Sequence, residues 1–146
     1  MFIGAHVSAA GGVWNAPKNA AAIGCEVLQM FTRPPMGGAA PKLTQDDAAH
    51  FRRAMKEHGI ERAYIHSPYF VNLASGKKAV RKNSARIIRE ELERGSLLGC
   101  RAVMFHPGSA KDVGATLGLQ YVIETIDVIM DGYEGSCQLL IEISAG

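Results

Sequence analysis

Three short apolar segments of the sequence each end on a residue type that binds metal ions. The segments are Ala63–His66, Ala102–His106 and Gln138–Glu142. Their last residues are separated by 40 and then 36 residues. Two imidazoles and one carboxylate form the protein half of a catalytic zinc site, with one position left for water. The sequence therefore predicts a metal site made by His66, His106 and Glu142.

The spacing of these residues corresponds to about one strand and one helix per step. In parallel sheets and barrels, the C-terminal ends of the strands converge on one face, where the three side chains can meet. His66 and His106 are each followed by a small residue or a proline, and this repetition argues against a coincidence. Zn2+ is the favoured ion because imidazole and carboxylate suit it, and Mn2+ and iron are the alternatives.

Apolar runs alternate with helical periodicity along the whole chain. We expect strands over 2–7, 26–31, 62–65, 101–105 and 139–142, and helices over 13–23, 44–58, 77–98 and 113–130. The strands read as apolar on both faces, as in a parallel sheet covered by helices. About five parallel strands and four helices indicate an α/β fold, either a small doubly wound sheet or a partial (β/α)8 TIM barrel. A full barrel needs about 250 residues, so we expect residues 1–146 to be the N-terminal portion of a single barrel domain, truncated after strand five.

Composition narrows the class of protein. The 146 residues are 47% hydrophobic and 21% charged, which excludes a disordered chain. No membrane span or signal peptide is visible, and the three cysteines are widely spaced, so we expect a cytoplasmic protein with free thiols and no membrane partner. A net charge of +2 is too small to argue for nucleic acid. For the basic cluster at 77–89, a solvated helix surface is favoured over a phosphate-binding stripe.

Four further residues lie where a substrate would approach the strand ends. His6, near the end of the first strand, is a fourth ligand, a hydrogen-bond donor to a ligand, or a substrate contact, and we favour the last two roles. Arg33, after the second strand, binds a phosphate or is simply solvated. Tyr69 and Asn72 contact a nucleic-acid groove, a sugar or a base, or only close their loop.

Four segments together resemble the endonuclease IV family of apurinic/apyrimidinic endonucleases. They are Ile3–Gly12, His66–Tyr69, Phe105–Ser109 and Leu140–Glu142. The resemblance spans residues 3–146 and covers about the first half of the family's barrel. It implies a TIM barrel with three zinc ions at the C-terminal strand face. It also implies base excision repair by hydrolysis of the phosphodiester 5′ to abasic sites in duplex DNA.

The resemblance also assigns roles to single residues. His66 and His106 match the terminal ligands of one zinc, and Glu142 matches a catalytic carboxylate that bridges this zinc to a second one. Tyr69 matches a residue that enters the DNA near the abasic nucleotide. Met36 stands where the family has a DNA-penetrating arginine, and Ile143 replaces a polar residue after Glu142.

The aspartate, histidine and glutamate ligands of the family's second half have no counterpart in the 146 residues. The chain is therefore expected to supply a full ligand set for one zinc and part of a second. Two other hypotheses remain open. One is a xylose-isomerase-like sugar isomerase or epimerase with a strand-end metal. The other is a non-catalytic metal-binding half-barrel that needs the missing C-terminal half as its partner.

Overall fold

The computed structural model describes residues 1–143. Its strands are β1 (Gly4–His6), β2 (Val27–Met30), β3 (Arg62–His66), β4 (Ala102–Phe105) and β5 (Gln138–Ile141). Its helices are α1 (Asn15–Ala22), α2 (Gln45–Glu57), α3 (Lys78–Leu98) and α4 (Ala115–Met130). The predicted elements are all present in these residues. The first strand is shorter than predicted because only Gly4–His6 pair with β2.

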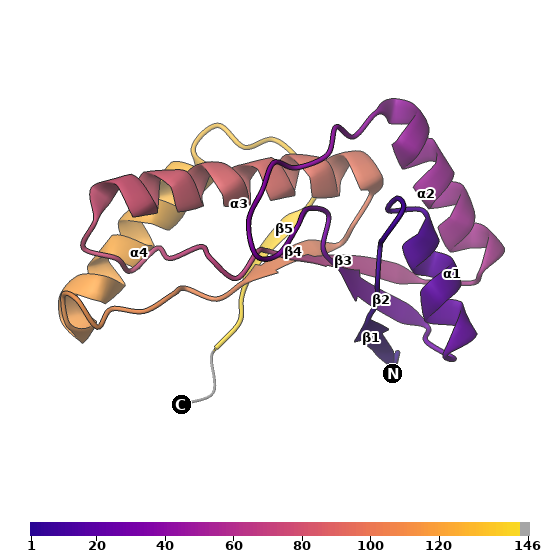
Figure 1. The fold of residues 1–146 in the computed structure, drawn as a ribbon, viewed down its shortest axis with the longest axis horizontal. Coiled ribbons are helices and arrows are strands. Elements are labelled where there is room, and N and C mark those ends of the chain that lie inside the picture. Colours follow the sequence, from indigo (N-terminus) through magenta and orange to yellow (C-terminus); the bar gives the residue numbers. More distant parts are fainter. Residues whose placement is uncertain (144–146) are drawn as a thin grey trace.

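The five strands are parallel and pair in the order in which they occur in the sequence, β1-β2-β3-β4-β5. A doubly wound sheet would reverse this order at a switch point, so the structure has the strand order of a barrel. Each crossover between parallel neighbours is right-handed by preference, which places the helices on the same side of the sheet. Figure 1 shows α3 lying along the sheet with α4 beside it, and α1 next to β2.

The helices cover one face of the sheet (Figure 1), so the expected helix cover of both faces was wrong, although β4 is apolar on both. Burial alternates along the strands: Ala63 and Ile65 of β3 are buried, whereas Arg62 is exposed and Tyr64 is half-buried. The other face of the sheet is the concave side of the barrel, and it carries polar side chains such as Gln29 of β2. His66, two residues after Tyr64, shares this concave side.

Helix α3 packs on the centre of the sheet and fixes the strands that carry the histidines. Its Ile88 and Leu92 are fully buried in the same core as Phe105 of β4. A side chain at Gly95 would bring a Cβ within 2.5 Å of Cys137 Sγ, so the helix needs a glycine here to approach the segment before β5. The helix ends at Gly99, whose φ of 80° is the left-handed conformation that glycine favours.

Helix α2 begins with a capping box. The Thr44 hydroxyl accepts a hydrogen bond from the Asp47 backbone N–H, and the Asp47 carboxylate accepts one from the Thr44 backbone N–H. Together these bonds satisfy N–H groups that have no partner within the helix. On its buried side α2 contributes Phe51 to the core.

Candidate metal centre

Three strands deliver the predicted ligands to one point. His66 is the last residue of β3, and His106 and Glu142 directly follow β4 and β5. Phe105 and Ile141 are register partners in the β4–β5 pair, so the next residue of each strand lies at the same level. His66 Nε2 is 3.1 Å from Glu142 Oε2, and His106 Nε2 is 3.9 Å from Glu142 Oε1. One ligand atom from each residue lies within 4.8 Å of the other two.

Backbone carbonyls select the ring nitrogen that each histidine offers to a metal. His66 Nδ1 is 2.7 Å from the carbonyl oxygen of Ser67, and His106 Nδ1 is 3.3 Å from that of Glu142. A carbonyl only accepts hydrogen bonds, so both Nδ1 atoms donate. The neutral rings then present the Nε2 lone pair to an ion, as is usual for metal-bound histidines.

The separations suit a small cation. Ligands at 2.0–2.2 Å from a tetrahedral zinc lie roughly 3.3 Å from one another. The 3.1 Å contact already has this spacing, and the 3.9 Å pair needs only a small rotation of the partly exposed Glu142 side chain. His66 is buried and His106 is half-buried, so the site has a fixed inner side and an open outer side.

His6 lies beside the three candidate ligands. Its ring centroid is 6.2 Å from that of His66, and its Nδ1 is 2.8 Å from Gln29 Oε1. It does not join the group of candidate ligand atoms found among residues 1–143. This position is compatible with the two roles favoured for His6, a hydrogen-bond donor to a ligand or a substrate contact. Both roles stay predictions.

Tyr69 is exposed next to the centre. Its side chain is 60% exposed, and its ring centroid is 5.7 Å from that of His66.

Asn72 forms hydrogen bonds within the protein. Its Oδ1 accepts hydrogen bonds from the backbone N–H groups of Ala74 and Ser109, and its Nδ2 donates one to the Ser109 carbonyl. Asn72 therefore connects the loop after β3 to the loop after β4, in agreement with the expected role in closing its loop. A contact between Asn72 and a substrate stays a prediction.

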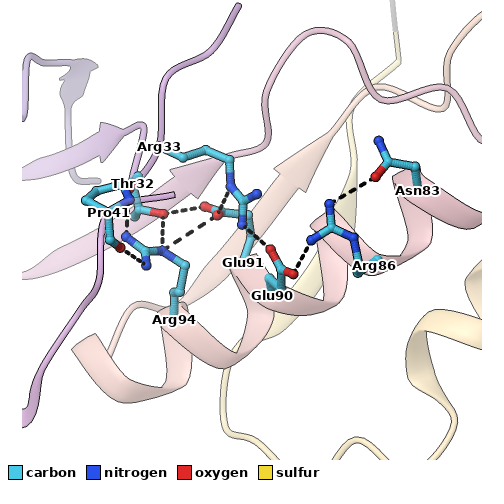
Figure 2. Close-up of polar contacts among 8 residues, drawn as sticks. All are labelled: Thr32, Arg33, Pro41, Asn83, Arg86, Glu90, Glu91 and Arg94. Carbon is cyan, nitrogen blue, oxygen red and sulfur yellow. Dashed lines mark hydrogen bonds and ion pairs between the residues drawn. The ribbon is translucent and has the colours of Figure 1, made fainter. Parts of the chain in front are cut away.

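Arg33 is neither solvated nor free. Its side chain is buried, with Nε 2.6 Å from Glu91 Oε1 and Nη2 2.9 Å from Glu90 Oε2 (Figure 2). Burial lowers the pKa of Arg33, but the charge of Glu91 and the hydrogen bonds to both carboxylates outweigh it, so the pKa is raised. A phosphate would have to compete with these two carboxylates, and the predicted phosphate contact stays a prediction.

The basic cluster at 77–89 is solvated in part, as expected: its lysines and Arg86 are exposed, whereas Arg81 and Arg89 contact α4. Arg89 donates hydrogen bonds to three carbonyls at the end of α4, those of Ile129, Asp131 and Gly132. The Arg81 guanidinium lies 3.7 Å from the centroid of the Tyr121 ring. These two arginines therefore hold α3 and α4 together.

Sequence reasoning missed Phe31, which directly follows β2. Its ring centroid is 4.4 Å from that of His6, 5.6 Å from that of His66 and 5.4 Å from that of Tyr69. It also lines a cavity of about 910 Å³ between the loop after β1 and the loop after β2. Phe31 could have been found from the sequence by the signal that indicated the histidines, namely a position directly after a strand.

Within the part of the chain that the structure describes, none of the helices combines the length and apolar character that crossing a bilayer requires. Cys25, Cys100 and Cys137 are all free thiols, as predicted, and the last two are buried.

Comparisons with known proteins agree with this architecture. The family model for xylose isomerase-like TIM barrels matches residues 17–146. "Probable endonuclease 4" of Geotalea daltonii is 34% identical over 148 residues, covering 99% of this chain and 51% of that protein. The protein of the same name from Halorhodospira halophila is 38% identical over 127 residues, covering 87% and 43%. The chain thus spans about half the length of these relatives.

Solved structures give the same result. The crystal structure of endonuclease IV from Thermus thermophilus has a TM-score of 0.83 and 30% identity, covering 97% of this chain and 51% of that chain. D-psicose 3-epimerase from Clostridium cellulolyticum has a TM-score of 0.67 at 12% identity, covering 97% and 52%, a likeness of fold alone. The resemblance to endonuclease IV is confirmed, and the chain belongs to the family of xylose isomerase-like TIM barrels.

Proposed function

We propose that this chain is the metal-bearing N-terminal half-barrel of a zinc-dependent endonuclease that hydrolyses the phosphodiester 5′ to abasic sites in duplex DNA. The observation that carries the proposal is the cluster of His66, His106 and Glu142 at three successive strand ends, in a chain similar to endonuclease IV proteins. Residues 1–146 would form one part of a single barrel domain acting in cytoplasmic base excision repair.

The chain's own residues would hold and orient the reacting groups. His66 and His106 would bind one zinc through Nε2, with their rings held by Nδ1 hydrogen bonds to backbone carbonyls. Glu142 faces each histidine with one carboxylate oxygen and would be the third protein ligand of this ion, and the resemblance assigns it a share in a second ion. Zinc, when bound, polarises a phosphoryl oxygen and activates water. The exposed Tyr69 ring would stack against the nucleotide at the lesion.

A sugar epimerase is the second candidate, and the fold of D-psicose 3-epimerase favours it. The higher identity and TM-score of endonuclease IV favour the nuclease. The third candidate is a metal-binding half that acts only with a partner. Its partner would be a polypeptide supplying the remaining barrel strands and ligands.

Metal content and incision of an abasic duplex test the proposal together. We expect the 146-residue chain to bind at most one zinc tightly and to incise the duplex very slowly, since it offers one cluster of candidate ligands in its described part. Supplying the C-terminal half of a relative in trans should raise incision 5′ to the lesion, and His66→Ala and His106→Ala should prevent this. His58→Ala, at the exposed end of α2, is the matched control.

Two results would contradict the proposal. Zinc content that is unchanged in both histidine variants would show that His66 and His106 are not zinc ligands. Epimerisation of a ketohexose, without incision of DNA by the reconstituted barrel, would favour the second candidate.

A further inference from the structure

A buried carboxylate on α3 organises the start of the loop after β2. The Glu91 side chain is fully buried. It accepts hydrogen bonds from the Thr32 hydroxyl and, at 2.6 Å, from Arg33 Nε (Figure 2). A buried carboxylate is costly unless it is paired and hydrogen-bonded. Glu91 therefore favours one position of Thr32 and Arg33 over others.

Arg94, one turn further along α3, holds both ends of this loop at once. Its Nη2 donates to the Thr32 carbonyl at 2.7 Å and its Nε to the Thr32 hydroxyl at 2.9 Å. Its Nη1 donates to the Pro41 carbonyl at 2.8 Å (Figure 2). The planar guanidinium reaches three acceptors in fixed directions, which the single ammonium of a lysine cannot do. Arg94 thus closes the loop formed by residues 32–41.

The loop of residues 32–41 reaches the metal centre through Tyr69. The Pro35 carbonyl accepts a hydrogen bond from the Tyr69 backbone N–H at 3.1 Å. Phe31, which precedes the loop, lies against both Tyr69 and His66. The loop also forms a wall of the 910 Å³ cavity, which Trp14 lines as well.

We propose that Arg94 is a positioning residue, which fixes the loop of residues 32–41 so that Tyr69 and Phe31 flank the metal centre in one prearranged geometry. The binding of abasic duplex DNA to this surface rests on the proposed function, whereas the loop geometry does not. A prearranged surface loses less conformational entropy on binding. Because the candidate ligands come from β3, β4 and β5, the loss of Arg94 should leave metal binding intact while it loosens the loop.

The test compares three variants of the full chain. Arg94→Gln removes the charge and two of the contacts, and Arg94→Lys keeps a charge near Glu91 but cannot reach all three acceptors. Lys82→Gln is the matched control, because Lys82 lies on the same helix, carries the same charge and is exposed near the opposite end of α3 from Arg94. Circular dichroism and zinc titration establish that each variant is folded and binds metal.

Two measurements report on the loop without any activity. Trp14 is the single tryptophan, so acrylamide quenching of its fluorescence reports on the cavity wall. Trypsin cleavage after Lys42 reports on opening of the loop end. Losing two or three hydrogen bonds, two of which are partly buried, predicts cleavage roughly tenfold faster in both Arg94 variants, with increased quenching. The control should match the parent protein in both measurements.

Binding of an abasic duplex, followed by fluorescence anisotropy, completes the experiment. We expect both Arg94 variants to bind the duplex several-fold more weakly at unchanged zinc affinity. Parental cleavage and quenching in both Arg94 variants would overturn the proposal. So would loss of zinc binding in step with loss of helical signal in both variants, since Arg94 would then only support the fold. If the parent chain binds no duplex, the proposed function fails, and the trypsin and Trp14 results still decide the role of Arg94.

Discussion

His66 Nε2 and Glu142 Oε2 lie 3.1 Å apart although 76 residues separate them in the chain. Their strands, β3 and β5, are not neighbours in the sheet, because β4 lies between them. Two strand spacings amount to roughly 10 Å between backbones. The two side chains span this gap by leaning toward each other across the end of β4, where His106 follows the strand. The order of the strands is therefore what brings these residues together.

The first prediction concerns the unequal contributions of the two histidines to zinc affinity. His66 is buried, and its Nε2 is 3.1 Å from Glu142 Oε2, the spacing of two ligand atoms on one zinc. His106 is half-buried, and its Nε2 is 3.9 Å from Glu142 Oε1. We expect His66→Ala to weaken zinc binding more than His106→Ala, and each to exceed the 10–100-fold loss typical of removing a supporting hydrogen bond. Competition with a chromophoric chelator measures this, with His58→Ala as the control. Equal affinity for zinc in His66→Ala and the parent would rule out His66 as a ligand.

The second prediction concerns the loop tip. Met36 is 84% exposed between Pro35 and two glycines, where the endonuclease IV pattern has an arginine. If the tip meets DNA, Met36→Arg should tighten binding to an abasic duplex and steepen its salt dependence by roughly 0.9 in log–log slope, the value for one added phosphate contact. Met130→Arg, on the exposed side of α4, is the control for added charge. An identical slope in the two variants would place the tip away from the DNA.

The third prediction is a pH dependence at the start of α2. Hydrogen bonds from the Thr44 side chain and backbone lower the pKa of the Asp47 carboxyl below its ordinary 3.8. A lowered folded-state pKa stabilises the protein above pH 3.8, and this contribution disappears as the pH falls through the lower folded value. Asp47→Asn should therefore flatten the loss of stability below this pH, as followed by urea unfolding. Thr44→Ala, which removes one of the hydrogen bonds to this carboxylate, should flatten the slope in part.

Removing the other half of the capping box gives a fourth prediction. Thr44→Ala deletes the hydroxyl that accepts from the Asp47 backbone N–H. We expect a loss of about 1 kcal/mol in the free energy of unfolding at neutral pH. Thr44→Ser keeps this hydroxyl and should retain most of the stability. A loss equal to that of Thr44→Ala would show that the methyl group, rather than the cap, is responsible.

The fifth prediction separates the three thiols. Burial raises the pKa of Cys137 to about 11, and burial also raises that of Cys100, so both remain protonated at pH 8. Because thiolate is the reactive form, a disulfide reagent should modify Cys25 first, and all three only after denaturation. Cys25→Ser should remove the fast phase. A fast phase that persists in this variant would show that a buried thiol becomes accessible.

Local patterns were enough to predict the elements and the three candidate ligands. Apolar runs indicated the strands, helical periodicity indicated the helices, and the strand-end rule indicated His66 and His106. The sheet order was not predictable in the same way, since the pattern of strands and helices suits a doubly wound sheet equally well. That order places the helices on one face only, which is why helix cover of the second face was wrongly expected.

The interactions of the arginines were beyond sequence reasoning. Arg33 pairs with Glu91 across 58 positions, and nothing near either residue indicates the other. A cation that follows a strand suits a phosphate contact and a buried ion pair equally well. Arg89 could likewise be assigned only once α3 and α4 were seen to be adjacent, because its acceptors are carbonyls, which carry no sequence signal.

The way Arg94 holds its loop has a consequence for protein engineering. Two of its three contacts are to main-chain oxygens, those of Thr32 and Pro41, which every amino acid possesses. Other residues of the segment 34–40 can therefore be exchanged at equal length if Gly37 and Gly38 are kept, since their φ values of 127° and 114° favour glycine. The loop is therefore suited to grafting recognition peptides beside the strand-end histidines. Thr32, Glu91 and Arg94 would be left unchanged to hold its ends.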